Sequence, residues 1–133
     1  MTSQKVLVSM VLVLFGSVGA WAQDDYPSRP VRIVIGFTPG GGPDLTARHI
    51  AQRLSEALKQ QVIVENRPGA GGTLAAAQVA RAPADGHTLL SVSSAHAVAQ
   101  AIYPRLPYDT YADLAGITMT GRSKYVLVVA PSL

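Results

Sequence analysis

The chain has 133 residues, of which 11 are Lys or Arg, 8 are Asp or Glu and none is Cys. This length fits a single domain, and a scattered net charge of +3 gives no indication of nucleic-acid binding. The absence of cysteine excludes disulfide bonds and a lipid-modified cysteine. Hydrophobic residues make up 48% of the chain, and many of them lie near the N-terminus.

Residues 1–22 have the pattern of a secretory signal peptide. Lys5 supplies positive charge, residues 6–20 form an apolar stretch, and Ala20-Trp21-Ala22 has the small residues of a cleavage site. A membrane anchor is the alternative, but a span needs about 20 apolar residues. We therefore expect export, cleavage after Ala22 and no membrane span in the mature chain.

The first expected unit is a strand, a glycine-rich turn and a helix. Residues 31–37 begin with β-branched apolar side chains, which are typical of a strand covered on both faces. Residues 38–43, TPGGGP, interrupt this strand and leave backbone N–H groups uncovered. We expect Asp44 to cap a helix over residues 45–59. A strand that leads through a glycine turn into a helix N-terminus is suited to holding an anion.

A second strand and a second glycine-rich loop follow. Residues 62–64 are expected to pair in parallel with the first strand through a right-handed crossover. The loop 65–72, ENRPGAGG, comes directly after this strand. Thr73 is expected to cap a short alanine-rich helix over residues 74–81.

The remaining chain is expected to contain three strands and one helix. The third strand covers residues 88–92 and leads into a helix over residues 95–102. Residues 103–111 contain two prolines and are expected to form an extended surface loop. Residues 115–120 and 125–130 are further candidate strands. This alternation predicts an α/β fold, with a mostly parallel sheet flanked by helices.

Three polar or glycine-rich segments each follow an expected strand: 38–43, 67–72 and 91–94. The carboxyl ends of parallel strands lie at one edge of a sheet, where ligands bind. We expect glycine N–H groups and serine hydroxyls from these segments to bind a carboxylate. A phosphate would be held by the same physics, and the alternative is that all three segments are only turns required by the fold.

No motif for nucleotide binding or catalysis accompanies these loops. Neither glycine-rich loop has the G-x-G-x-x-G spacing or the G-K-[ST] ending of nucleotide sites, and no serine lies in a G-x-S-x-G motif. His49, His87 and His96 do not have metal-ligand spacing. We therefore expect no catalytic residue, cofactor or metal, and His96 is the histidine nearest to the expected site.

Residues 26–133 contain five motifs in a fixed order: YPSRPVRIVIGFTPGGGPDLTAR, VIVENRPGAGG, ADGHTLL, IYPRLPYDTYADLAGIT and VLVVAPSL. Together they resemble the Bug family, the periplasmic receptors of tripartite tricarboxylate transporters. The resemblance implies a type II periplasmic-binding-protein fold, whose two lobes close on a small carboxylate. It also implies that the ligand is delivered to membrane permease subunits.

The resemblance further implies which residues contact the ligand. In this family the first glycine turn and the loop after the third strand hold one ligand carboxylate, with bridging waters. The matching positions in this sequence are Phe37, Thr38, Pro39, Gly40, Gly41, Asp44, Ser91, Ser93, Ser94 and Ala95.

Family members are more than twice as long and have a second lobe. We therefore expect residues 23–133 to be a partial first lobe without the second, and this chain alone to bind weakly or not at all. The leading hypothesis is a non-enzymatic receptor in the periplasm. The alternatives are a truncated, inactive copy of such a receptor and a small α/β enzyme domain that holds a phosphate or acyl group.

Overall fold

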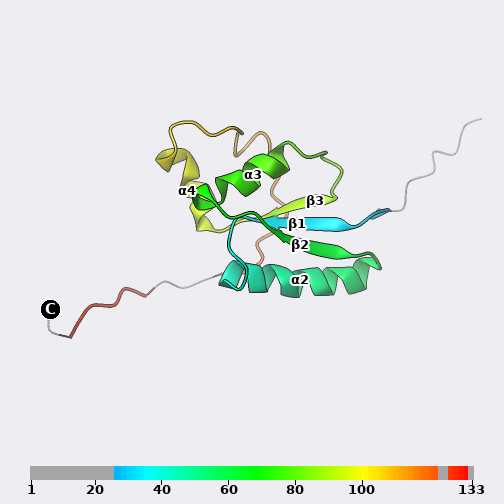
Figure 1. Cartoon of the computed structure of the whole chain (residues 1–133), viewed down its shortest axis with the longest axis horizontal. Coiled ribbons are helices and arrows are strands. Elements are labelled where there is room, and N and C mark those ends of the chain that lie inside the picture. The colour runs from blue at the N-terminus through cyan, green and yellow to red at the C-terminus, as the bar shows by residue number, and fades with distance from the viewer. Residues whose placement is uncertain (1–25, 123–125, 132–133) are drawn as a thin grey trace, which may run out of the picture.

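The computed structural model describes residues 26–122 and 126–131. Within them, three parallel strands form a sheet with helices on both faces (Figure 1). The central strand β1 (Val31–Ile35) lies between β2 (Val62–Asn66) and β3 (Thr88–Ser91). The register places Ile33 opposite both Val64 and Leu89. The predicted α/β class with a parallel sheet is confirmed.

The helices lie in two layers. Helix α2 (Gly42–Leu58) covers one face of the sheet, and α3 (Thr73–Ala80) lies over the other face (Figure 1). A 3₁₀ turn, η1 (Ala70–Gly72), leads directly into α3. Helix α4 (Ser94–Ile102) begins just after β3.

One apolar cluster lies on each face of the sheet. On one face, alternate residues of β1 pack against Ala47 and Ala51 of α2. On the other face, Ala76 and Ala77 of α3 pack with Tyr108. Small alanine side chains allow both helices to approach the sheet closely. Burial of β1 on both sides agrees with its run of β-branched residues.

The first helix begins earlier than predicted. Helix α2 starts at Gly42, with Gly41 as its N-cap and Pro43 in the first turn. Proline is tolerated there because its missing N–H would have no partner within the helix. Asp44 therefore lies inside the first turn, and our prediction that it is the N-cap is wrong.

Other boundaries differ from the predictions by one or two residues; β1, for example, ends at Ile35 and not at residue 37. Strand β2 continues to Asn66, and the next residue, Arg67, still donates its N–H to the carbonyl of Ile35 at 2.8 Å. Helix α3 begins at Thr73 with Gly72 as its N-cap, so Thr73 is not the cap that we expected. The hydroxyl of Thr73 instead donates to the carbonyl of Ala70 at 2.9 Å.

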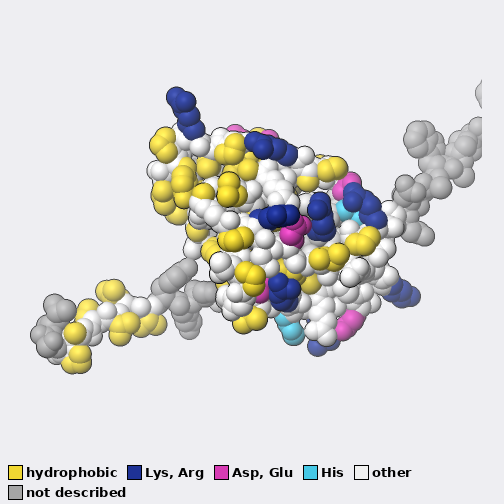
Figure 2. All heavy atoms as spheres, viewed as in Figure 1, with side chains coloured by type: hydrophobic (Ala, Val, Ile, Leu, Met, Phe, Trp, Pro, Cys, Tyr) yellow, Lys and Arg dark blue, Asp and Glu magenta, His cyan; other side chains and the backbone are white. Residues whose placement is uncertain are grey.

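The two late strand predictions are wrong for the residues that the structure describes. Neither residues 115–120 nor residues 126–130 form a strand, and position 125 lies outside the described residues. Leu127 is 93% exposed, and its segment lies apart from the folded body (Figure 2). A strand requires a hydrogen-bonded neighbour, and neither segment pairs with one in this structure. Apolar composition alone was therefore not sufficient to predict a strand in these two segments.

The expected signal peptide, residues 1–22, lies outside the described residues. Within the described ranges, no helix is both long enough and apolar enough to cross a membrane.

Candidate functional site

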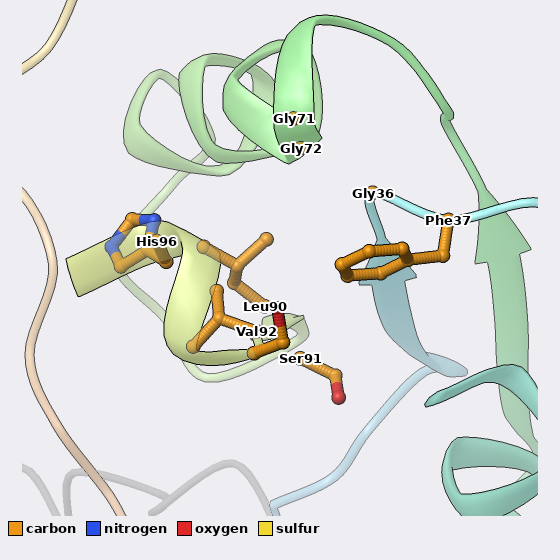
Figure 3. Close-up of a pocket in the computed structure, with 9 residues that line it drawn as sticks. Gly36, Phe37, Gly71, Gly72, Leu90, Ser91, Val92 and His96 are labelled. Carbon is orange, nitrogen blue, oxygen red and sulfur yellow. The ribbon is translucent and has the colours of Figure 1, made fainter. Parts of the chain in front are cut away.

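Three loops meet at the carboxyl edge of the sheet. The β1–α2 turn (residues 36–41) follows β1, the β2–α3 loop (67–72) follows β2, and the β3–α4 loop (92–93) follows β3. Figure 3 shows a small pocket at this edge to which all three connections contribute. Its lining includes Gly36, Phe37, Gly72, Ser91, Ser93 and His96.

A wider depression lies between the start of α2 and the β3–α4 loop. Gly42, Pro43 and Thr46 line it on the α2 side, and residues 91–94 line it on the other. Residues 118–122 form a further wall and bring in the guanidinium-bearing Arg122. Because the N–H groups in the first turn of a helix lack intrahelical partners, this depression is suited to an anion.

The carboxylate of Asp44 lies beneath the β1–α2 turn and is 2% exposed. Its Oδ2 accepts from the Gly40 N–H at 2.8 Å and from Arg48 Nε at 3.0 Å. Its Oδ1 accepts from Asn66 Nδ2 at 2.9 Å. The contact between Asp44 and the Gly40 N–H resembles a capping box, in which a side chain in the first helical turn bonds back to the backbone before the helix.

These donors change the acidity of Asp44. The hydrogen bond from Arg48, followed by those from Gly40 and Asn66, lowers its pKa to about 2, although burial acts in the opposite direction. The side chain is therefore an anion at neutral pH, with its charge neutralised locally by Arg48. All the donors come from the protein, so this carboxylate is part of the support of the turn.

Asn66 connects β2 to the β1–α2 turn. In addition to Asp44, its Nδ2 reaches the carbonyl of Phe37 at 3.1 Å. Its Oδ1 accepts from Arg48 Nη2 at 2.9 Å. One side chain at the end of a strand therefore contacts the turn, the buried acid and its counter-ion.

The β1–α2 turn also touches the β2–α3 loop through two glycines. A Cβ placed on Gly36 would lie 2.4 Å from the Cα of Gly72, so a side chain has no room there. In the second loop, Gly71 has φ +64° and Gly72 has φ +92°, values that favour glycine. The fold brings the two glycine-rich segments together as the sheet-edge argument predicted.

The β3–α4 loop is organised by its own serines. Ser93 is the N-cap of α4, and its Oγ accepts from the Ala95 N–H at 3.3 Å. The ring of His96 stacks on Tyr108 with centroids 6.1 Å apart, and burial lowers the pKa of His96. The imidazole at the pocket is therefore neutral at neutral pH.

The predicted contact residues fall into three groups. Phe37, Ser91 and Ser93 share the pocket, and Ser94 lines the adjoining depression with Ser91 and Ser93. Asp44 is buried beneath the turn. The others line neither hollow: Thr38, Pro39, Gly40, Gly41 and Ala95.

Sequence reasoning missed three structural contributors: Gly36, Arg48 and Asn66. Arg48 was predicted only as part of the helix over residues 45–59, and Asn66 only as part of the loop 65–72. An amide side chain two residues after the predicted apolar strand 62–64 and two residues before Pro68 was the available signal for Asn66.

The parallel α/β sheet and the amide-rich loops at its carboxyl edge define a ligand-binding α/β lobe of the solute-binding type. Residues 46–133 match the family TctC, described as the tripartite tricarboxylate transporter family receptor. The chain belongs to this family. The resemblance to the Bug receptors is thereby confirmed.

Two curated relatives are similar over nearly the whole chain. Protein BugT of Bordetella pertussis is 37% identical over 100% of this chain, which corresponds to 41% of BugT. A UPF0065 protein of Pseudomonas sp. strain P51 is 40% identical over 95% of this chain and 38% of that protein. This chain therefore spans about two fifths of the length of these relatives.

Solved structures show the same fold. The periplasmic binding protein BugD superposes with a TM-score of 0.64 and 40% identity, covering 66% of this chain and 29% of BugD. MatC of Rhodopseudomonas palustris, solved with bound malate, superposes with a TM-score of 0.61 and 43% identity. That match covers 66% of this chain and 30% of MatC.

Proposed function

We propose that this chain is the carboxylate-anchoring part of an exported solute-binding receptor, which passes its ligand to a tripartite tricarboxylate-type permease. The observation that carries the proposal is the convergence of three loops on one sheet edge beside the N-terminus of α2. Family membership and the malate bound to MatC support a small carboxylate as the ligand.

The proposed anchor consists mainly of backbone N–H groups. Within α2, Gly42 and Asp44 lie in the first turn, where N–H groups have no intrahelical acceptor. The hydroxyls of Ser91 and Ser93 face the same region from the other side. Together with the positive end of the helix dipole, these donors match the charge of a carboxylate.

The role is binding without chemical transformation. Asp44 is occupied by protein donors, and among the described residues that line the pocket His96 has no acid beside it and no hydrogen bond to Ser91 or Ser93. BugD is a periplasmic binding protein, and MatC was solved with bound malate. This arrangement favours a receptor over an enzyme that holds a phosphate or acyl group.

The direct test is a titration of the ¹⁵N-labelled chain with malate, followed by amide NMR, which detects millimolar binding. We expect saturable shifts at Thr38, Gly42 and Ser93, and weak affinity because one lobe leaves the ligand exposed. Phosphate, ATP and glucose are the comparison ligands. Larger shifts with ATP or phosphate than with every organic acid tested would reject the carboxylate proposal.

Gly41→Val is the matched variant. A Cβ at Gly41 meets only the Thr38 carbonyl at 3.6 Å and Pro43 Cδ at 3.9 Å, and its φ of −75° suits any residue. The variant should therefore remain folded but lose malate binding, because the valine side chain crowds the N–H of the next residue, Gly42. Unchanged binding would show that this part of the turn has only a structural role.

We also propose that residues 1–22 direct export to the periplasm and are removed after Ala22, leaving residues 23–133 as a partial first lobe. The mass of the exported protein tests this directly. A mass that begins at Gln23 supports the proposal, whereas an intact N-terminus retained in the membrane rejects it.

A further inference from the structure

We propose that Asn66 is the positioning residue of the carboxylate site, because its side chain sets the peptide plane of Phe37 and Thr38 and holds Asp44 beneath the turn. This inference rests on the proposed function, since it assigns how the β1–α2 turn presents its amides to a carboxylate. It concerns a residue that does not itself touch the ligand.

Asn66 sets the orientation of the peptide plane between Phe37 and Thr38. The Phe37–Thr38 peptide is trans and planar, so its C=O and N–H point in opposite directions. Asn66 Nδ2 donates to this carbonyl at 3.1 Å, which directs the carbonyl toward the β2 side. The Thr38 N–H is thereby directed away from β2.

The amide of Gly40 is not available to a ligand. The Gly40 N–H donates to Asp44 Oδ2 at 2.8 Å, and Asn66 holds the other oxygen of the same carboxylate at 2.9 Å. Gly40 is therefore turned inward even though it lies in the middle of the glycine turn. The Thr38 N–H has no hydrogen-bond acceptor among the described residues, whereas the Gly40 N–H is bonded to Asp44.

Asn66 is itself held in place by its backbone and by its side chain. It is the last residue of β2 and pairs with Ile35 in the ladder, which continues through the Arg67 N–H to the Ile35 carbonyl. Its Oδ1 is held by Arg48 at 2.9 Å, so the orientation of its amide group is determined by a cation. A side chain anchored at both ends can transmit the position of the sheet to the turn.

Asn66→Ala removes both donors without adding charge. We expect malate affinity to fall about tenfold, the effect of losing one charge-assisted hydrogen bond that orients the site. In the unliganded variant, the Thr38 and Gly40 amides should shift and exchange faster with solvent, while the other β2 amides keep their protection. Gln61→Ala, directly before the first residue of β2, is the matched control and should leave all three measurements unchanged.

Asn66→Asp adds a readout that a purely structural role would not produce. The aspartate has the same shape but cannot donate when ionised, and it then faces the carboxylate of Asp44 and the carbonyl of Phe37. Protonation restores one donor, so the ratio of wild-type to variant affinity should fall toward one as the pH is lowered from 7 to 4. The titration of malate affects the wild type and the variant equally over this pH range, so it cancels in the ratio of their affinities.

The outcomes separate the two proposals. If the wild-type chain binds malate and Asn66→Ala binds it equally well with unshifted Thr38 and Gly40 amides, the positioning role is rejected and the receptor function stands. If the wild-type chain binds no organic acid, the proposal that this chain anchors a carboxylate by itself fails. The amide spectra then still decide whether Asn66 sets the turn, and unchanged spectra reject that role.

Discussion

The β1–α2 turn and the β2–α3 loop are both rich in glycine, but they are held in place by different means. The first is held by side chains, because Asp44 and Asn66 bond to its backbone. The second depends more on backbone conformation, because Gly69, Gly71 and Gly72 all have positive φ angles, whereas in the first turn only Gly40 does. Glycine therefore has different roles in two segments that look alike in sequence. The following predictions address this difference.

The largest effect is expected where the two segments touch. Gly36→Ala would place a Cβ 2.4 Å from the backbone of Gly72, which cannot move aside as a flexible side chain would. We expect the free energy of unfolding to fall by about 3 kcal/mol, the upper end for overpacking. Urea denaturation measures it, and an unchanged midpoint would show that the loops are not in close contact.

Gly72→Ala should have a smaller effect on the same contact. Its Cβ would lie 3.7 Å from the Cα of Gly36, an ordinary distance, so only the φ of +92° opposes the substitution. We expect a loss of about 1–2 kcal/mol in the free energy of unfolding. A loss equal to that of Gly36→Ala would contradict the distinction between contact and conformation.

Acidification should weaken the side-chain support of the β1–α2 turn. The pKa of Asp44 in the folded chain is about 2, below its ordinary value of 3.8. Its stabilising contribution is therefore present above about pH 4 and is lost as the pH falls toward 2. Urea midpoints measured from pH 5 to pH 2 should fall more steeply for the wild type than for Asp44→Asn. Parallel curves would show that Asp44 is not held as an anion.

The smallest effect on stability is expected at Gly42. A Cβ there meets nothing within 4 Å, and the residue is not in the left-handed region. Gly42→Ala should change the free energy of unfolding by less than about 1 kcal/mol, and in the stabilising direction because the unfolded chain loses freedom. A clear fall in the melting temperature would mean that position 42, like the β2–α3 loop, requires a backbone conformation that favours glycine.

The same contrast explains which parts of the candidate site were predictable. The three loops were located correctly because each follows an apolar strand, and parallel topology brings strand ends to one edge. The role of Asp44 was mistaken, because Pro43 allows the helix to begin earlier than a search for capping residues indicates. Asn66 was missed because its partners Phe37 and Asp44 lie 29 and 22 residues away in the chain.

The sequence by itself determined the α/β class, the helices and strands up to residue 102, and the family. The class and the elements followed from apolar periodicity and glycine spacing, which are local properties, whereas the family followed from the resemblance of five ordered motifs. Only the tertiary structure decided that residues 115–120 and 126–130 are not strands here, and that the Gly40 amide turns inward to Asp44. These outcomes depend on hydrogen-bond partners, and the partners of a segment are set by which distant residues the fold places beside it.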